Sequence, residues 1–218
     1  MQEHVEVTGI VLKSEPIGDF DRRIVILSAE RGKISAFAKG ARRPNSRFVA
    51  GTTPFSFGTF ALYEGKNSYT VKEIVVKNYF EDLRSDFDGA YYGMYFLEIA
   101  DYYTRENNDE KDMLKLLYQS LRALISENFD NRLVRAIFEL KAIMVNGEFP
   151  GIPIKEGREY LKSTVYAIDY INDNEASKVY SFTVKEDVLQ ELCEIAKKIR
   201  GNVINFQFKS LEIHDTLA

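Results

Sequence analysis

Apolar and polar residues alternate in short runs over the first 80 residues of the chain. Alternation with a period of two indicates β-strands, and Gly, Asp and Asn bound the runs as turn signals. Gly32 in "AERGK" can supply the positive φ of a tight hairpin, and "EGKN" is a second hairpin loop. The pattern therefore predicts five strands, at Val5–Lys13, Arg22–Ser28, Ile34–Lys39, Thr59–Tyr63 and Tyr69–Lys77.

The connection between the third and fourth of these strands is longer than the others. Five short strands with one such connection are typical of a small closed barrel of the OB type. A barrel of the SH3-like type is the alternative that the same pattern allows.

Beyond Asn78 the apolar period changes to about 3.6 residues, which indicates helices. One helix is expected from Asp88 to Thr104. Asn108 is the expected N-cap of a second helix, whose apolar face carries Leu114, Leu117, Leu121 and Leu124.

Two further helices have boundary signals. Asp130 can cap a third helix, and Gly147 can end it in the left-handed conformation. Thr183 and Glu186 have the spacing of a capping box, which predicts a fourth helix running to Gly201. The core face of the third helix is expected to consist of Leu133, Ile137, Leu140 and Met144.

Residues 148–182 separate the third and fourth helices. They begin with two prolines and contain the β-rich runs "STVYAIDYI" and "KVYSF", which predict a small ordered insert with β-structure. We therefore predict an α+β fold, with a five-stranded OB-type barrel over residues 1–80 and a helical domain over 81–218 that carries the insert at about 148–182.

The composition is that of an ordinary globular protein, since 45% of the 218 residues are apolar and 28% are charged. No apolar run approaches the roughly 20 residues of a membrane span, and "MQEHVEVTG" lacks the basic and apolar regions of a signal peptide. A single cysteine, Cys193, excludes an intrachain disulfide and agrees with a reducing compartment. We expect a cytoplasmic protein without membrane contact.

Charge is divided unevenly along the chain. Residues 1–80 contain 12 Lys and Arg against 8 Asp and Glu, whereas residues 81–218 contain 17 against 25. The stretch 22–47 alone holds eight cations and one acid, Glu30. Such a concentration of like charge is unfavourable unless an anionic partner or nearby acids offset it, and a phosphate backbone is the obvious partner.

On the predicted third strand, Phe37 and Lys39 point to one side, and Ile34, Ala36 and Ala38 to the other. If the small apolar set lines the barrel, Phe37 faces outward, where a base can stack on it; the alternative is that Phe37 is a core residue. The residues expected to contact DNA are Lys39, Arg42, Arg43 and Arg47, with Arg22, Arg23, Lys33 and Phe37 as second choices.

Two stretches of the chain carry a family resemblance. "TGIVLKSEPIGDFDRRIVILSAERGKISAFAKGARRPNSR" and "TPFSFGTFALYEGKNSYTVKE" resemble the N-terminal domain of the RecO family of bacterial DNA repair proteins, and the closing "FKSLEIHD" is consistent with it. The similarity covers the whole chain in layout and is most specific at Gly9, Asp21, Gly32, Lys33, Lys39, Gly40, Ala41, Arg42 and Arg43.

The resemblance implies a recombination mediator with an OB-fold and a helical domain, located in the cytoplasm with the nucleoid. Members bind single-stranded and double-stranded DNA, anneal complementary strands and help load recombinase onto DNA coated with single-strand-binding protein. The implied partners are RecR, the acidic C-terminal tail of single-strand-binding protein and, in some species, RecF. An acidic tail that ends in an apolar residue needs a basic rim around an apolar pocket, for which the candidates are Arg132, Arg135 and Lys141; the alternative is that they form a plain polar helix face.

One feature departs from the family pattern. Many members carry four zinc-binding cysteines in the region of 148–182, and this chain has none there. We therefore expect no structural zinc. Cys193 is expected to be buried as a small hydrophobic residue on the apolar side of its helix, with Val188, Leu189, Leu192, Ala196 and Ile199.

Groups for catalysis are few. His4 and His214 lie near opposite termini and are expected to be solvated, the carboxylate runs fit no Ca²⁺ loop, and no phosphate-binding glycine motif occurs. We therefore expect no catalytic residues and no cofactor. Two alternatives remain, namely a non-catalytic protein-interaction scaffold with an OB-like or SH3-like barrel, and a hydrolase or nuclease.

Overall fold

The computed structural model describes residues 4–66, 68–155, 157 and 159–211. These residues form two compact units. The barrel unit comprises residues 1–81 and 100–114, and the helical unit comprises residues 82–99 and 115–218. The first unit thus takes in a segment beyond the predicted boundary at residue 80.

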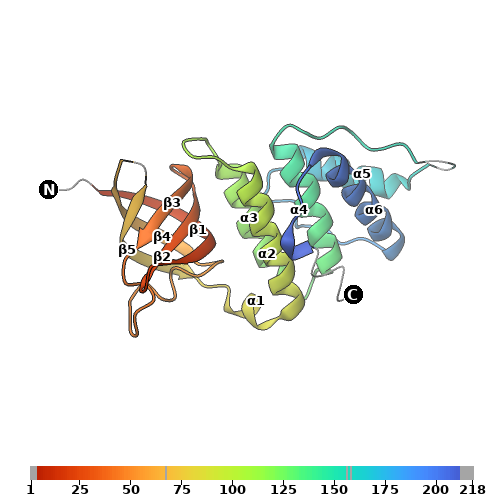
Figure 1. The fold of residues 1–218 in the computed structure, drawn as a ribbon. Coiled ribbons are helices and arrows are strands. Elements are labelled where there is room, and N and C mark those ends of the chain that lie inside the picture. The colour runs from red at the N-terminus through yellow and green to blue at the C-terminus, as the bar shows by residue number, and fades with distance from the viewer. Residues whose placement is uncertain (1–3, 67, 156, 158, 212–218) are drawn as a thin grey trace. The chain divides into compact units, whose positions relative to one another are not determined.

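The barrel unit contains five strands, which Figure 1 shows in red to yellow. Their hydrogen-bonded order is β1-β2-β3-β5-β4 in a closed barrel, which confirms the predicted OB-type fold. All neighbouring pairs are antiparallel except β3 and β5, which pair in parallel through Ala36 with Tyr69 and Phe37 with Thr70. The strands span His4–Ile17 (β1), Asp21–Ser28 (β2), Gly32–Ala38 (β3), Phe57–Glu64 (β4) and Tyr69–Asn78 (β5).

Side chains that alternate along the strands fill the barrel. Ile34, Ala36 and Ala38 on β3 are buried inside, as the alternation predicts. Their neighbours in the core come from the other four strands and from the β3–β4 connection. They include Val7, Val11, Ile24, Ile26, Ala41, Phe48, Phe60, Leu62 and Val71.

The turn between β2 and β3 ties the barrel to residues 104–107. Lys33 N donates to Arg105 O at 3.0 Å, and Asn107 N donates to Arg31 O at 2.9 Å. Gly32 has a φ of +63°, and a Cβ on it would lie 2.3 Å from Arg105 O. Glycine is therefore required here both for the turn and for the close approach of the second segment.

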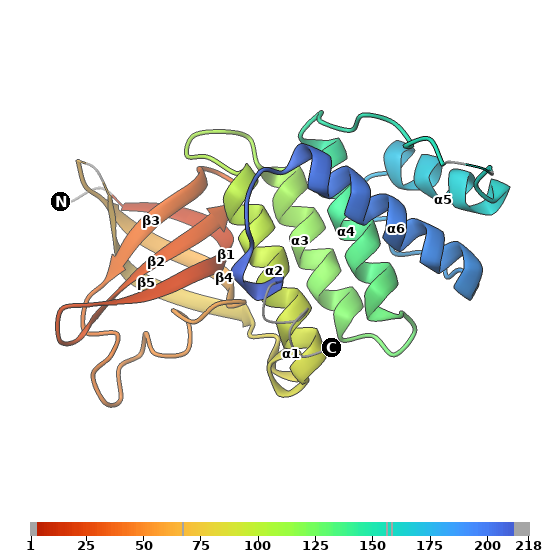
Figure 2. The same cartoon turned by 45° about the vertical axis from the view of Figure 1, so that its right-hand side comes forward.

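The helices span Glu81–Ser85 (α1), Phe87–Tyr103 (α2), Lys111–Leu124 (α3), Asn131–Val145 (α4), Lys162–Asp173 (α5) and Glu186–Val203 (α6). Within the helical unit, α4, α5 and α6 pack on one another, as Figure 2 shows. The helix predicted at 88–104 is confirmed as α2, whereas the short α1 was not predicted. Of the helices in the described residues, none combines the length and the apolar character that crossing a membrane requires.

The predicted boundaries of α4 are confirmed. The Asp130 carboxylate accepts a hydrogen bond from Arg132 N, and Gly147 has a φ of +72°. Leu133, Ile137 and Leu140 are buried in the core, whereas Met144, in the last turn, is only partly buried.

Two other predicted caps are wrong. Helix α3 begins at Lys111 rather than after Asn108, because residues 105–107 are held along the β2–β3 turn. Helix α6 has Lys185 as its N-cap, without a side-chain cap, and Thr183 lies outside the helix. Glu186 does not reach back to Thr183, since its carboxylate pairs with Arg132 of α4 at 2.9 Å.

The β-structure predicted in the insert is also wrong. The run "STVYAIDYI" lies in α5, and the described part of 148–182 contains no strand. Thr164, Ala167, Ile168 and Ile171 are buried along one face of α5, a spacing of three or four residues. Packing of this face overrides the β-propensity of the branched and aromatic residues between.

The described residues contain no group of three or more His, Cys, Asp or Glu side chains placed to hold a metal ion. The absence of structural zinc stays a prediction. His4 is exposed, as expected, and His214 lies outside the described residues.

Candidate nucleic-acid interface

Phe37 lies on the outer surface of the barrel. It pairs with Arg23 on β2 and with Thr70 on β5, and it is partly buried, whereas Ala36 and Ala38 on either side of it are in the core. The outward orientation predicted from the alternation is confirmed. Its use as a stacking platform stays a prediction.

Two residues that the sequence reasoning missed share this outer surface. Tyr63 on β4 pairs with Thr70, and the Lys72 ammonium lies 5.8 Å from the centre of the Tyr63 ring. The alternation with buried Leu62 would have revealed that Tyr63 faces outward. Lys72 was harder to place, because a register shift between Ala61 and Leu62 changes the pairing of β5 at this point.

The β3–β4 connection, residues 39–56, is anchored to the β1–β2 hairpin. Gly40 N donates to Asp21 Oδ1 at 2.7 Å, Arg42 N donates to Phe20 O at 2.8 Å, and Arg42 Nη1 donates to Gly18 O at 3.1 Å. Gly40 has a φ of +68°, the left-handed conformation that lets the chain leave β3 sharply. Hydrogen bonds thus fix the basic stretch to the barrel.

Arg43 and Arg47 each lie against an aromatic ring. The guanidinium carbon of Arg43 is 5.2 Å from the centre of the Phe20 ring, and that of Arg47 is 4.8 Å from the centre of the Phe48 ring. Arg47 Nη2 also donates to Lys72 O at 2.8 Å, which joins the connection to β5. Both arginines remain exposed.

Four of the predicted DNA-contacting cations therefore belong to one connection, and no carboxylate among the described residues forms an ion pair with them. Within the described part of the chain, the ion pairs include none of Lys39, Arg42, Arg43 and Arg47. All four are exposed, and the arginines bond to carbonyl oxygens or lie over rings, so the cationic surface expected from the sequence is present.

Arg22 and Arg23 have different surroundings. Arg22 Nη1 donates to Thr52 Oγ1 at 3.0 Å and to Val49 O at 3.3 Å, so it holds the far side of the β3–β4 connection. Arg23 is exposed beside Phe37, where its Nε donates to Ser35 Oγ at 2.9 Å. Its only ion pair among the described residues is a loose one, 4.0 Å from Glu15.

Lys33 lies apart from the other candidates. Its Nζ donates to Asp101 O at 2.5 Å and pairs with Asp101 Oδ1 at 3.1 Å, and Lys13 pairs with the other carboxylate oxygen at 2.7 Å. Burial opposes ionisation of Asp101, but hydrogen bonds from the two lysines outweigh it, so the pKa of Asp101 is lowered. Lys39 lies six positions after Lys33, which corresponds to about 20 Å of extended chain. The Lys33 ammonium is therefore paired with a carboxylate of the barrel unit itself.

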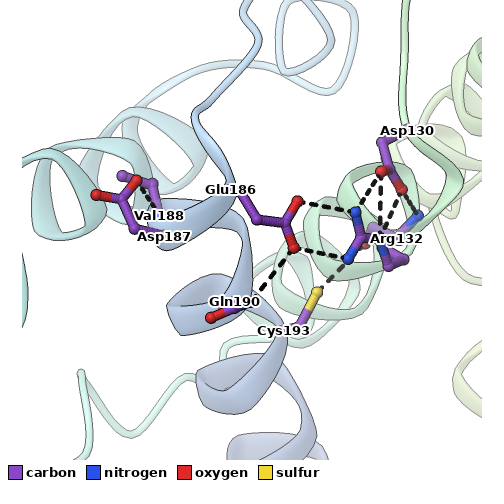
Figure 3. Close-up of polar contacts among 7 residues, drawn as sticks. All are labelled: Asp130, Arg132, Glu186, Asp187, Val188, Gln190 and Cys193. Atoms are coloured by element: carbon purple, nitrogen blue, oxygen red, sulfur yellow. Dashed lines mark hydrogen bonds and ion pairs between the residues drawn. The ribbon is translucent and has the colours of Figure 1, made fainter.

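The three candidates for partner contact do not form one basic rim. Lys141 is buried, with its Nζ donating to Asn172 O at 3.0 Å, whereas Arg132 and Arg135 line a pocket with Tyr92, Ala136, Cys193 and Lys197. Arg132 donates to the carboxylates of both Asp130 and Glu186, as Figure 3 shows, and these bonds raise the pKa of Arg132. Arg135 pairs with the buried Glu139 at 3.0 Å.

Cys193 is only partly buried in this pocket, which departs from the full burial expected. Its thiol lies 3.8 Å from Arg132 O. Desolvation raises the pKa of the thiol to about 11, so it stays protonated at neutral pH.

Comparison with known proteins agrees with this architecture. A family model for the N-terminal part of recombination protein O matches residues 1–80, and one for its C-terminal part matches residues 84–150. The chain belongs to the RecO family. A protein from Acetivibrio thermocellus named DNA repair protein RecO is 29% identical over 98% of this chain and 97% of its own length.

Other proteins named DNA repair protein RecO are also similar to this chain. One from Alkaliphilus metalliredigens is 34% identical over 67% of this chain and 59% of its own length, and one from Clostridium perfringens is 25% identical over 96% of both. The N-terminal RecO model covers all five strands, whereas α5 and α6 lie beyond the C-terminal one.

Proposed function

We propose that the protein acts in DNA repair as a recombination mediator. It binds single-stranded and double-stranded DNA, anneals complementary strands and helps load recombinase onto DNA coated with single-strand-binding protein. The observation that carries the proposal is the β3–β4 connection, where Lys39, Arg42, Arg43 and Arg47 are exposed and have no carboxylate partner among the described residues. Membership of the RecO family, whose named relatives are DNA repair proteins, supports it.

The proposed mechanism is electrostatic. Two complementary strands repel each other through their phosphates, and cations that contact both backbones lower this repulsion so that bases can pair. Arginine suits this role because its guanidinium can hold a phosphate with two N–H groups. Phe37, Tyr63 and Lys72 on the adjoining outer surface offer rings and charge to the bases and phosphates of one strand.

Family membership supports a set of proposed partners. We propose RecR, the C-terminal tail of single-strand-binding protein and, in some species, RecF. For the acidic tail, the pocket beside Arg132 and Arg135 offers apolar walls at Ala136 and Ala196, with the exposed Lys197 at its edge. A labelled tail peptide should bind the protein, and Lys197→Glu should weaken binding; equal binding by both would place the tail elsewhere.

Charge reversal at the connection tests the proposed function. The double variant Arg42→Glu with Arg43→Glu should lose annealing of complementary strands, measured by the pairing of two labelled oligonucleotides. The matched control is Lys178→Glu with Lys185→Glu, which makes the same change in net charge at two exposed lysines of the helical unit. Annealing that survives the reversal at Arg42 and Arg43 rejects the site, and a wild-type protein that binds no DNA favours the scaffold alternative.

A further inference from the structure

The tip of the β1–β2 hairpin presents an aromatic ring to solvent. Phe20 is 48% exposed and takes no part in the barrel core. The guanidinium carbon of Arg43 lies 5.2 Å from the centre of its ring. We propose that Phe20 and Arg43 together bind one unpaired nucleobase of a DNA strand, which stacks on the exposed surface of this pair. The inference rests on the proposed DNA binding and adds a site that selects unpaired bases.

Hydrogen bonds fix the backbone that carries Phe20, on both sides of the residue. Phe20 O accepts from Arg42 N at 2.8 Å, its neighbour Asp21 accepts from Gly40 N at 2.7 Å, and Gly18 O accepts from Arg42 Nη1 at 3.1 Å. The β1–β2 hairpin and the β3–β4 connection are therefore joined next to Phe20 and Arg43 before any ligand arrives, and the Arg43 guanidinium lies against the ring. A preorganised pair loses little conformational entropy when a base stacks on it.

The surroundings of the ring suit a nucleotide. A nucleotide combines a flat aromatic face with a phosphate, and here Phe20 lies beside the exposed cations Arg42 and Arg43. Stacking on an aromatic side chain together with contact to a neighbouring cation is the usual way in which proteins hold single strands. Two acids flank Phe20 in the chain. Asp19 is exposed, and the Asp21 carboxylate is bonded to Gly40 N.

This arrangement implies a preference among DNA structures. In a duplex, both faces of an internal base are covered by its neighbours, so a ring held at a hairpin tip cannot stack on it without unstacking the helix. Phosphates, in contrast, are accessible in both forms. Phe20 should therefore contribute to binding of single strands and not to binding of duplexes, whereas Arg42 should contribute to both.

The absence of tryptophan from the chain allows a direct test. In the variant Phe20→Trp, the new indole is the only tryptophan, and stacking of a base on it should quench its fluorescence when a single-stranded oligonucleotide is added. The control is Phe87→Trp at a 72% exposed position of the helical unit, which should show no quenching. Heparin, a polyanion without bases, should bind Phe20→Trp without quenching it.

Affinity gives a second readout. Phe20→Ala and Phe20→Leu should each weaken binding of a single-stranded oligonucleotide about tenfold, because neither residue offers a ring. Duplex affinity and the salt dependence should stay unchanged, and so should the circular dichroism spectrum, since the side chain is outside the core. Phe87→Ala should bind like the wild type.

The outcomes separate the two levels of the proposal. Salt-dependent DNA binding that is indifferent to Phe20→Ala, or a Phe20→Trp signal that single strands do not change, rejects the stacking site alone. Equal losses for single strands and duplexes would also reject it, because a stacking role predicts a difference. A wild-type protein that binds no DNA rejects the proposed function, and the site with it.

Discussion

Asp21 on β2 accepts a hydrogen bond from Gly40 N at 2.7 Å, which fixes the point where the basic connection leaves β3. Asp21 directly follows Phe20 in the chain. This one bond therefore joins the hairpin that carries the exposed ring to the connection that carries the cations. An acid thus anchors the basic connection.

Removing this carboxylate should weaken DNA binding. On charge alone, Asp21→Ala should strengthen binding, since it removes a negative charge near the phosphates. We expect the opposite, a loss of about fivefold, because the connection loses a bond worth about 1 kcal/mol and becomes less ordered. Fluorescence anisotropy with a labelled single strand measures the effect, and Asp19→Ala, at an exposed acid of the same hairpin, is the control. Tighter binding by Asp21→Ala would refute the ordering role.

Lys33 should act on stability rather than on DNA. Its ammonium is held by Asp101 at 3.1 Å, and both side chains are about one-fifth exposed. Lys33→Ala should lower the free energy of unfolding by about 1 kcal/mol and leave the salt dependence of DNA binding unchanged. Arg43→Ala should leave the free energy of unfolding unchanged and reduce the salt dependence of DNA binding. Urea denaturation and anisotropy on both variants check this, and a reduced salt slope in Lys33→Ala would restore Lys33 to the DNA-binding set.

Gly32 should tolerate substitution poorly. In Gly32→Ala, the new Cβ would add a collision with Arg105 O to the strain of a φ of +63°, and we expect a loss of about 3 kcal/mol in the free energy of unfolding. Gly18 has a similar φ of +51° but nothing within 4 Å of its Cβ position, so Gly18→Ala should cost only about 1 kcal/mol. Equal losses in thermal or urea denaturation would show that the contact with residues 104–107 is not required.

Glu191 should make the stability of the insert depend on pH. Its buried carboxylate accepts hydrogen bonds from Lys155 Nζ at 2.7 Å, Thr164 Oγ1 at 2.7 Å and Leu161 N at 3.0 Å. Burial alone would raise the pKa of Glu191, but these bonds lower it to about 2. A lowered pKa means that the stabilisation is present above the unfolded-state value of about 4.5 and is lost as the pH falls towards 2.

The variant Glu191→Gln isolates this contribution. At pH 7 it should lower the free energy of unfolding by about 3 kcal/mol, because Lys155 is left without its buried partner. The difference from the wild type should shrink between about pH 4.5 and pH 2. Glu194→Gln, at an exposed position of α6, should have little effect at any pH. A difference for Glu191→Gln that is constant down to pH 2 would contradict the lowered pKa.

The barrel could be predicted from the sequence because its signal is local. Alternation places Ile34, Ala36 and Ala38 inside and Phe37 outside, and the structure agrees. The cations of the β3–β4 connection could be predicted in the same way, since no acid lies between Lys39 and Arg47. These features depend on period and composition, which are visible along the chain.

What could not be predicted depends on contacts between distant residues. Along the sequence Lys33 resembles the neighbouring cations, and only its ion pair with Asp101, 68 residues away, distinguishes it. The spacing of Glu186 from Thr183 predicts a capping box, but the Glu186 carboxylate pairs with Arg132, 54 residues away. The run "STVYAIDYI" has β-forming residues but folds as α5, because its buried face packs on other helices. Phe20 has no signal in the sequence, since only the fold brings the Arg43 guanidinium over its ring.

The central claim is that the connection holding Arg42 and Arg43 binds phosphates, and the salt dependence of binding tests it most directly. About five phosphate contacts predict that the logarithm of the affinity for a single strand falls with the logarithm of the salt concentration at a slope of roughly −3.5. Neutralising Arg42 and Arg43 together to Gln should reduce the slope to about −2.1, since two contacts are removed. A slope near −3.5 in both proteins would contradict the account.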